Sequence, residues 1–200
     1  MSSKPALPSL TFITVLIAFA CGCAPKSNLK PFEYLGQKAG EETAQLARNQ
    51  GSVMAIWERF EAMPNPNTEA QVTGFKTAIA KSKGITLKEG KEFVRAVSDD
   101  PRMWPAGQVG RFISLAEGTD VAVLFVTLPM MLAPEEITAL KNSKTKFIIV
   151  GGQSPMLDAL IKQKAVQAAI VNRIPAKPAP GGAETAVQWF DRVYMVVKPM

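Results

Sequence analysis

The sequence contains no histidine, and its only two cysteines, Cys21 and Cys23, lie close to the amino terminus. Without histidine, Ser–His and Cys–His nucleophile pairs are excluded, and the commonest zinc ligand is missing. The position of the cysteines excludes a disulfide or a thiolate metal site in the remainder of the chain. We therefore expect no catalytic centre, no metal and no cofactor, and we interpret the protein as a non-enzyme.

Long runs of charge of one sign are also lacking. The 200 residues hold 23 basic and 17 acidic side chains, for a formal net charge of +6, and they form no Lys/Arg block or basic–aromatic stripe. This distribution does not predict nucleic-acid binding. The composition, 47% hydrophobic and 20% charged, is that of an ordinary globular domain with one core.

The amino-terminal segment has the pattern of an export signal. The stretch from Leu10 to Ala20 is apolar but too short to span a bilayer, and small residues and the two cysteines follow it. The pattern resembles a bacterial lipoprotein signal, in which a cysteine after a small residue is lipidated and becomes the new amino terminus. Cys21 fits slightly better than Cys23, and a cleaved signal without lipid is the alternative.

These features predict three segments with different roles. They are a signal peptide over 1–20, a tether over 21–31 and a single folded domain over 32–200. Several acyl chains together hold a protein on a membrane durably. We therefore expect a domain in the cell envelope that faces the periplasm and is anchored to a membrane by lipid.

Two apolar stretches determine the expected fold. The segment from Asp120 to Pro129, DVAVLFVTLP, shows no polar alternation, which is typical of a strand covered on both faces. The segment from Lys146 to Val150, KFIIV, is the next such strand. A buried helix is the alternative for the first stretch, but its length, its β-branched residues and its closing proline favour a strand. We expect the two strands to be parallel neighbours.

Helical and extended patterns alternate along the rest of the domain, which predicts βαβ units. Further strands are expected at 52–57, 166–171 and 194–197, with an edge strand or loop at 85–94. Helices are expected at 32–49, from 67 to the glycine at 84, from 99, from 134, from 154 and at 183–191. The predicted fold class is α/β, with three layers and a mostly parallel sheet of five or six strands that carries helices on both faces.

The order of these segments is similar to that of the C-terminal lobe of type I periplasmic sugar-binding proteins, the ribose-binding and lac-repressor-core family. The stretch from Asn67 to Phe75 resembles the family's Asn-Ala-x-x-Arg-x-x-Gly-Phe helix start. Residues 146–152 resemble the strand that ends at the ligand-binding aspartate, and 157–175 resemble the family's Leu-x-x-Leu-Ile, strand, Gln-x-Pro sequence. The resemblance covers about 36–197. It implies that a single periplasmic-binding-protein lobe binds a sugar-like or other small polar ligand and serves ABC-type uptake or sensing.

The sequence departs from the family at the positions that grip the ligand. Gln71, Gln153 and Asn172 stand where the family has an arginine, an aspartate and a glutamine. Charge-assisted bonds are roughly twice as strong as neutral ones, so we expect weaker sugar binding. The segment before the first helix is too short to form the family's other lobe. A second copy or a partner lobe would then complete the site, or the lobe serves as a protein-interaction or structural module without tight ligand binding.

Carboxyl ends of parallel strands meet at one edge, and this edge is where open α/β sheets bind ligands. We therefore predict a ligand site formed by Trp57, Arg59, Asn67, Gln71, Thr127, Gln153 and Asn172. Each has a structural alternative, such as packing under the loop for the tryptophan, helix capping for Asn67 and a backbone bond for the threonine. General acid–base chemistry would fall to Glu58 or to a lysine, and nothing specific recommends either.

Overall fold

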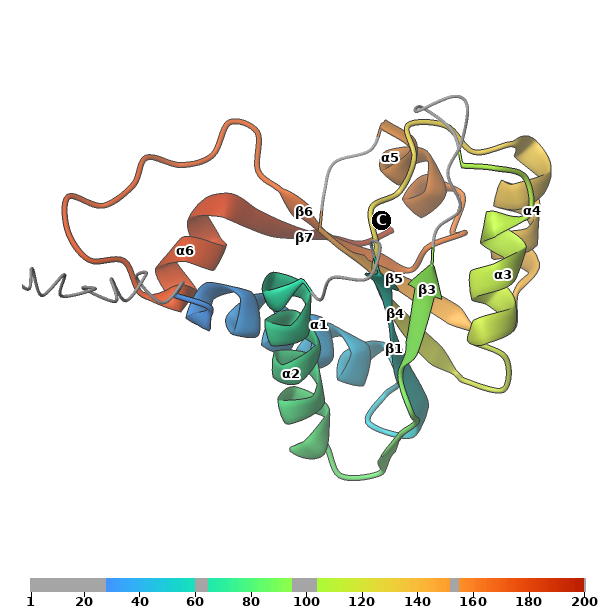
Figure 1. Cartoon of the computed structure of the whole chain (residues 1–200), viewed down its shortest axis with the longest axis horizontal. Coiled ribbons are helices and arrows are strands. Elements are labelled where there is room, and N and C mark those ends of the chain that lie inside the picture. Colours follow the sequence, from blue (N-terminus) through green and yellow to red (C-terminus); the bar gives the residue numbers. More distant parts are fainter. Residues whose placement is uncertain (1–27, 60–64, 95–103, 152–154, 200) are drawn as a thin grey trace, which may run out of the picture.

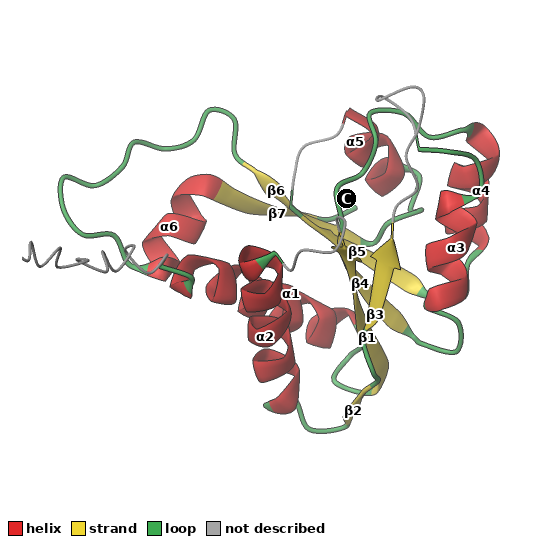
Figure 2. Cartoon of the chain, viewed as in Figure 1, coloured by secondary structure: helices red, strands yellow, loops and turns green. Residues whose placement is uncertain are grey.

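The fold of the protein is given by a computed structural model that describes residues 28–59, 65–94, 104–151 and 155–199. Strands and helices alternate along these residues (Figures 1 and 2). The helices are α1 (Lys30–Leu46), α2 (Pro66–Ala80), α3 (Gln108–Leu115), α4 (Pro134–Asn142), α5 (Pro155–Lys162) and α6 (Ala186–Val193). The strands are β1 (Gly51–Arg59), β2 (Ile85–Leu87), β3 (Lys91–Val94), β4 (Val121–Phe125), β5 (Lys146–Val150), β6 (Ala168–Asn172) and β7 (Tyr194–Val197).

One seven-stranded sheet organises the domain, in the order β2-β1-β4-β5-β6-β7, and β3 also pairs with β1. All pairs are parallel except β6 with β7. The α/β prediction is confirmed, but the sheet exceeds the five or six strands expected. The reason is that the segment 85–94 forms two short strands, which pair with the first and last thirds of β1. They are separated where Lys88 donates its backbone N–H to Val53.

The apolar stretch from Asp120 to Pro129 contains the central strand β4. All five residues of this strand are buried, and it lies between β1 and β5. Val121 pairs with Lys146 and Leu124 pairs with Ile149, in the parallel sense that was predicted. The strand is shorter than the predicted 120–129, because the extended pairing stops at Phe125 and the chain turns toward α4.

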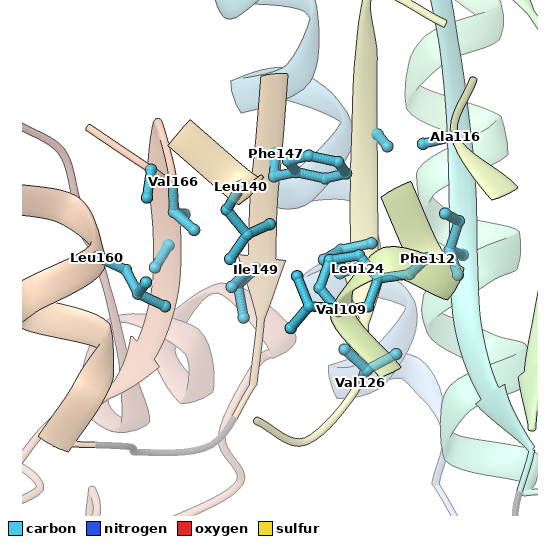
Figure 3. Packing of buried hydrophobic residues seen from close by; sticks show 14 of the residues in the cluster. Val109, Phe112, Ala116, Leu124, Val126, Leu140, Phe147, Ile149, Leu160 and Val166 are labelled. Carbon is cyan, nitrogen blue, oxygen red and sulfur yellow. The ribbon is translucent and has the colours of Figure 1, made fainter. Parts of the chain in front are cut away.

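Helices cover both faces of the sheet, which confirms the three layers (Figure 1). The helices α1, α2 and α6 contribute Leu35, Phe75 and Phe190 to a core on one face. The helices α3, α4 and α5 cover the other face, where Phe112, Leu140 and Leu160 pack against the strands (Figure 3). Each such large side chain contributes roughly 1.5–3 kcal/mol relative to exposure.

The helices α1 and α2 cross at glycines that have no room for a side chain. A β-carbon at Gly36 would lie 2.6 Å from the carbonyl carbon of Gln71, and one at Gly40 would lie 2.6 Å from the β-carbon of Ala78. At Gly74 the β-carbon would lie 2.8 Å from the carbonyl carbon of Glu33. The absence of these side chains lets the two backbones touch and fixes the relative position of both helices.

Several predicted helix boundaries are wrong by a few residues, and two of them have a clear local cause. Asn65, rather than Asn67, caps α2: its side chain accepts the backbone N–H of Asn67 at 3.0 Å, and Pro66 takes the first helical position. The first helix ends at Leu46, because Arg48 and Asn49 adopt left-handed backbone conformations that a helix cannot contain. The start predicted at residue 99 lies outside the described residues. Among the helices that the structure describes, none is long and apolar enough to cross a bilayer.

Candidate functional site

A cleft of about 460 Å³ opens at the carboxyl edge of the sheet, on the face that α1 and α2 cover. Its floor is apolar and consists of Leu35 from α1 and the ends of β4 and β5, Phe125, Val126 and Val150. Its polar wall is formed by Glu58, Asn65, Thr68, Gln71, Thr127 and Tyr194. An apolar floor beneath a few convergent polar groups is the usual character of a small-molecule site.

The first turns of α2 supply three of these polar side chains. Asn65 caps the helix, Thr68 lies in the first turn, and Gln71 follows three residues later on the same side. The close crossing at Gly36 and Gly74 holds this part of α2 against α1, so that Leu35 and Gln71 face one cleft. The position of the amide therefore depends on the two glycines.

Glu58 joins two neighbouring strands at the mouth of the cleft. Its Oε2 accepts the backbone N–H of Thr127 at 3.2 Å, just beyond the end of β4. It is the only charged side chain among the described residues that line the cleft. No lysine or arginine of the described part of the chain takes part in this lining, so the wall presents hydroxyls, amides and one carboxylate to a ligand.

Tyr194 closes the cleft from the antiparallel strand β7. Its ring stacks on Phe190 at 5.9 Å and lies 5.1 Å from Trp189. Burial raises the pKa of Tyr194, because the phenolate form would lose its hydration. The phenol is therefore protonated at neutral pH and can either donate or accept a hydrogen bond in the cleft.

The predicted site residues fall into two groups. Gln71 and Thr127 both line the cleft. Trp57 instead packs against the core on the α1 and α2 face. The guanidinium of Arg59 pairs with Glu92 at 2.8 Å, where both side chains are exposed.

Three further predicted residues lie apart from the described lining. Asn67 belongs to the first turn of α2, where its N–H bonds to the cap, and it does not line the cleft. Asn172 ends β6 and pairs with Tyr194 across the sheet without joining the lining. Gln153 lies outside the described residues.

Sequence reasoning missed Asn65, Thr68 and Tyr194, and it did not include Glu58 among the predicted ligand-binding residues. The Asn-Pro pair at 65–66 is a helix-cap signal, and it could have placed Asn65 and Thr68 at the start of the helix beside the cleft. No local signal indicates Tyr194, because its place depends on the antiparallel return of β7. No group of three or more acidic or cysteine ligands suited to a metal occurs in the described ranges.

No protein-family model matches the chain, and no curated protein matches its sequence. Solved structures do share its fold. GanP, a glucose-galactose binding protein from Geobacillus stearothermophilus, is 16% identical with a TM-score of 0.51, and the match covers 70% of this chain and 47% of GanP. XylFII is 14% identical with a TM-score of 0.55, over 84% of this chain and 61% of XylFII.

A regulator shares the same fold. A putative LacI transcriptional regulator from Bacteroides fragilis is 14% identical with a TM-score of 0.51, and the match covers 80% of this chain and 50% of the regulator. The chain thus has the fold of a single lobe of the type I periplasmic binding proteins, as the sequence resemblance implied. It spans about half the length of the solved structures that it matches.

Proposed function

We propose that the protein is a lipid-anchored domain of the cell envelope that binds a small polar, sugar-like ligand without covalent chemistry. The observation that carries this proposal is the cleft at the carboxyl edge, where neutral hydrogen-bonding groups and one carboxylate stand above an apolar floor. Alternating donors and acceptors of this kind match the hydroxyl groups of a sugar, while the apolar floor suits its C–H face. GanP and XylFII share the fold that supports such a cleft.

The affinity is expected to be modest. Gln71 offers an amide where the resembled family has a guanidinium, so the cleft lacks one charge-assisted bond to a hydroxyl. Uptake or sensing through an ABC-type system is the biological role that we propose for this binding.

Isothermal titration against a panel of pentoses, hexoses, amino sugars and nucleosides tests the ligand. We expect heat with at least one neutral sugar, loss of that heat in Gln71→Ala, and no change in Thr77→Ala. Thr77 lies on the same helix but is exposed, and its hydroxyl bonds to the carbonyl of Thr73. Flat titrations across the whole panel would remove the ligand proposal.

A protein-interaction module is the second candidate function. One observation favours it: a complex of XylFII with LytSN also matches the fold, at 17% identity and a TM-score of 0.51. Analytical ultracentrifugation without any sugar tests it. A stable dimer or complex in the absence of ligand supports this candidate, and a monomer that binds sugar contradicts it.

Membrane fractionation tests the anchor that the proposal includes. We expect the full chain in the membrane fraction and a Cys21→Ser, Cys23→Ser double variant in the soluble fraction. If both proteins divide in the same way between the membrane and soluble fractions, lipidation is contradicted. The ligand proposal is then still decided by the titration.

A further inference from the structure

The two ends of α1 mark the two edges of the sheet. Leu35, in the second turn of the helix, lines the cleft at the carboxyl edge. Leu46, its last residue, lines a hollow at the amino edge together with Gly51 and Val121, the first residues of β1 and β4. The chain therefore enters the described domain on the carboxyl side of the sheet and runs toward the amino edge.

The start of α1 is also fixed against α6. The ring of Phe32 meets that of Trp189 at 5.6 Å, edge to face, and Trp189 in turn touches Tyr194 of the cleft. Figure 1 shows the beginning of α1 beside α6. The point where the tether joins the domain thus lies on the same side as the cleft.

The tether limits how far this point can lie from a lipidated cysteine. Asn28 comes seven positions after Cys21 and five positions after Cys23, so the reach is roughly 17–25 Å in full extension. The 17 residues of α1 alone are roughly 25 Å long. A lipid anchor would therefore hold the start of α1, and with it the carboxyl side of the domain, near the bilayer.

Four of the seven large exposed hydrophobic side chains among the described residues lie at the carboxyl edge, and the other three are Leu87, Val187 and Met195. Val94 ends β3 and is 53% exposed, Met130 and Met131 follow β4 with 55% and 53%, and Ile174 follows β6 with 74%. Among the described residues, the loops that lead into the parallel strands at the amino edge contain no large exposed hydrophobic side chain. These four side chains are spread along one edge of the sheet, from the end of β3 to the loop after β6.

The amino edge has the opposite character. Exposed cations stand in and beside the loops that precede the parallel strands: Arg48, Lys81, Lys83, Lys141, Lys144, Lys146, Lys162 and Lys164. The carboxylate of Asp120, which lies among them, accepts the N–H and the hydroxyl of Ser52 at 2.7 and 2.8 Å. This edge is strongly hydrated and is suited to face water.

We infer that the carboxyl edge of the domain lies on the surface of the bilayer that carries its lipid anchor, with Val94, Met130, Met131 and Ile174 in the interface. This inference rests on the anchor in the proposed function, and the bilayer is the occupant because the tether begins on this side. Transfer of methionine and branched aliphatic side chains from water into the headgroup–acyl boundary is favourable. Four such side chains alone would not attach the domain durably, and the lipid anchor supplies that attachment. The cleft then opens toward the membrane, and a bound ligand lies beside it.

Depth-dependent quenching tests this orientation in the full lipidated chain, reconstituted in phosphatidylcholine vesicles. A genetically encoded fluorescent amino acid replaces Met131 in one sample and, as the matched control at the amino edge, Lys144 in the other. Nitroxide carried on the lipid headgroup is the quencher. We expect strong quenching at 131 and only background quenching at 144.

Hydrogen exchange of the unlabelled wild-type chain gives a second readout that needs no substitution. Exchange at 128–131 should be slower on vesicles than in the Cys21→Ser, Cys23→Ser variant, while exchange at 143–145 should be equal in both. Equal quenching at the two labels, or stronger quenching at 144, would overturn the inference. If the label at position 131 is quenched by a nitroxide on a second copy of the protein but not by the lipid nitroxide, the carboxyl edge contacts another copy and not the bilayer, and the inference is overturned.

The outcomes separate this inference from the proposed function. Wild-type chain that floats with the vesicles while position 131 stays unquenched overturns the orientation alone. Wild-type chain that does not float contradicts the anchor, and the orientation falls with it. Sugar titration remains an independent measurement in both cases.

Discussion

Replacing Gly74 with alanine should destabilise the domain by opening the contact between α1 and α2. The new β-carbon would lie 2.8 Å from the carbonyl carbon of Glu33 and 3.0 Å from the backbone nitrogen of Gln37, closer still to the carbonyl oxygen of Glu33. These atoms belong to helix backbone, so relief requires α1 as a whole to move away from α2.

The expected net cost follows from two opposing effects. Overpacking costs roughly 1–3 kcal/mol, and the upper end applies because no flexible side chain can yield. Alanine gains about 1 kcal/mol over glycine in a helix interior. We therefore expect Gly74→Ala to lower the free energy of unfolding by about 2 kcal/mol.

Gly110→Ala is the matched control. Gly110 is also helical, in α3, but a β-carbon there would meet nothing within 4 Å. Only the propensity effect remains, and we expect a gain of about 0.5–1 kcal/mol. Urea unfolding followed by far-ultraviolet circular dichroism measures both variants. A midpoint for Gly74→Ala equal to or above that of the wild type would refute the reasoning about the crossing.

Three further predictions concern the core and two titrating groups. Phe112→Ala should lose about 3–5 kcal/mol in urea unfolding, because the ring packs in a buried aromatic cluster, whereas exposed Ser114→Ala should change little. The N–H and hydroxyl of Ser52 hold the pKa of Asp120 below its ordinary value, so the carboxylate stabilises the fold at neutral pH. That stabilisation is lost as the pH falls through the lowered pKa. The difference in melting temperature between the wild type and Asp120→Asn should therefore shrink below about pH 4. A difference that stays constant with pH would contradict this prediction. Because burial raises the pKa of Tyr194, its phenolate absorbance should develop above the ordinary pH of about 10, and Tyr194→Phe should remove that late component of the titration.

The carboxyl-edge location of the site could be predicted, while its composition could be predicted only in part. Gln71 and Thr127, which line the cleft, stay predictions as ligand-binding residues; they could be proposed because helix starts and strand ends have clear local signals. Trp57 and Arg59 were placed at the same edge, but their side chains turn to the core and to Glu92. The direction in which a strand-end side chain points depends on its neighbours across the sheet, and one sequence does not contain that information.

The sequence by itself determined the alternation of helices and strands, the buried parallel pair of β4 and β5, and the edge at which a cleft would form. These features follow from hydrophobic patterns and turn residues that act within a few positions of each other. Only the tertiary structure decided that the 85–94 segment divides into two strands, that Tyr194 closes the cleft, and that Gly36 and Gly74 set the spacing of its walls. Those outcomes depend on contacts between residues far apart in the chain, where packing in three dimensions selects one arrangement from many that the local patterns allow.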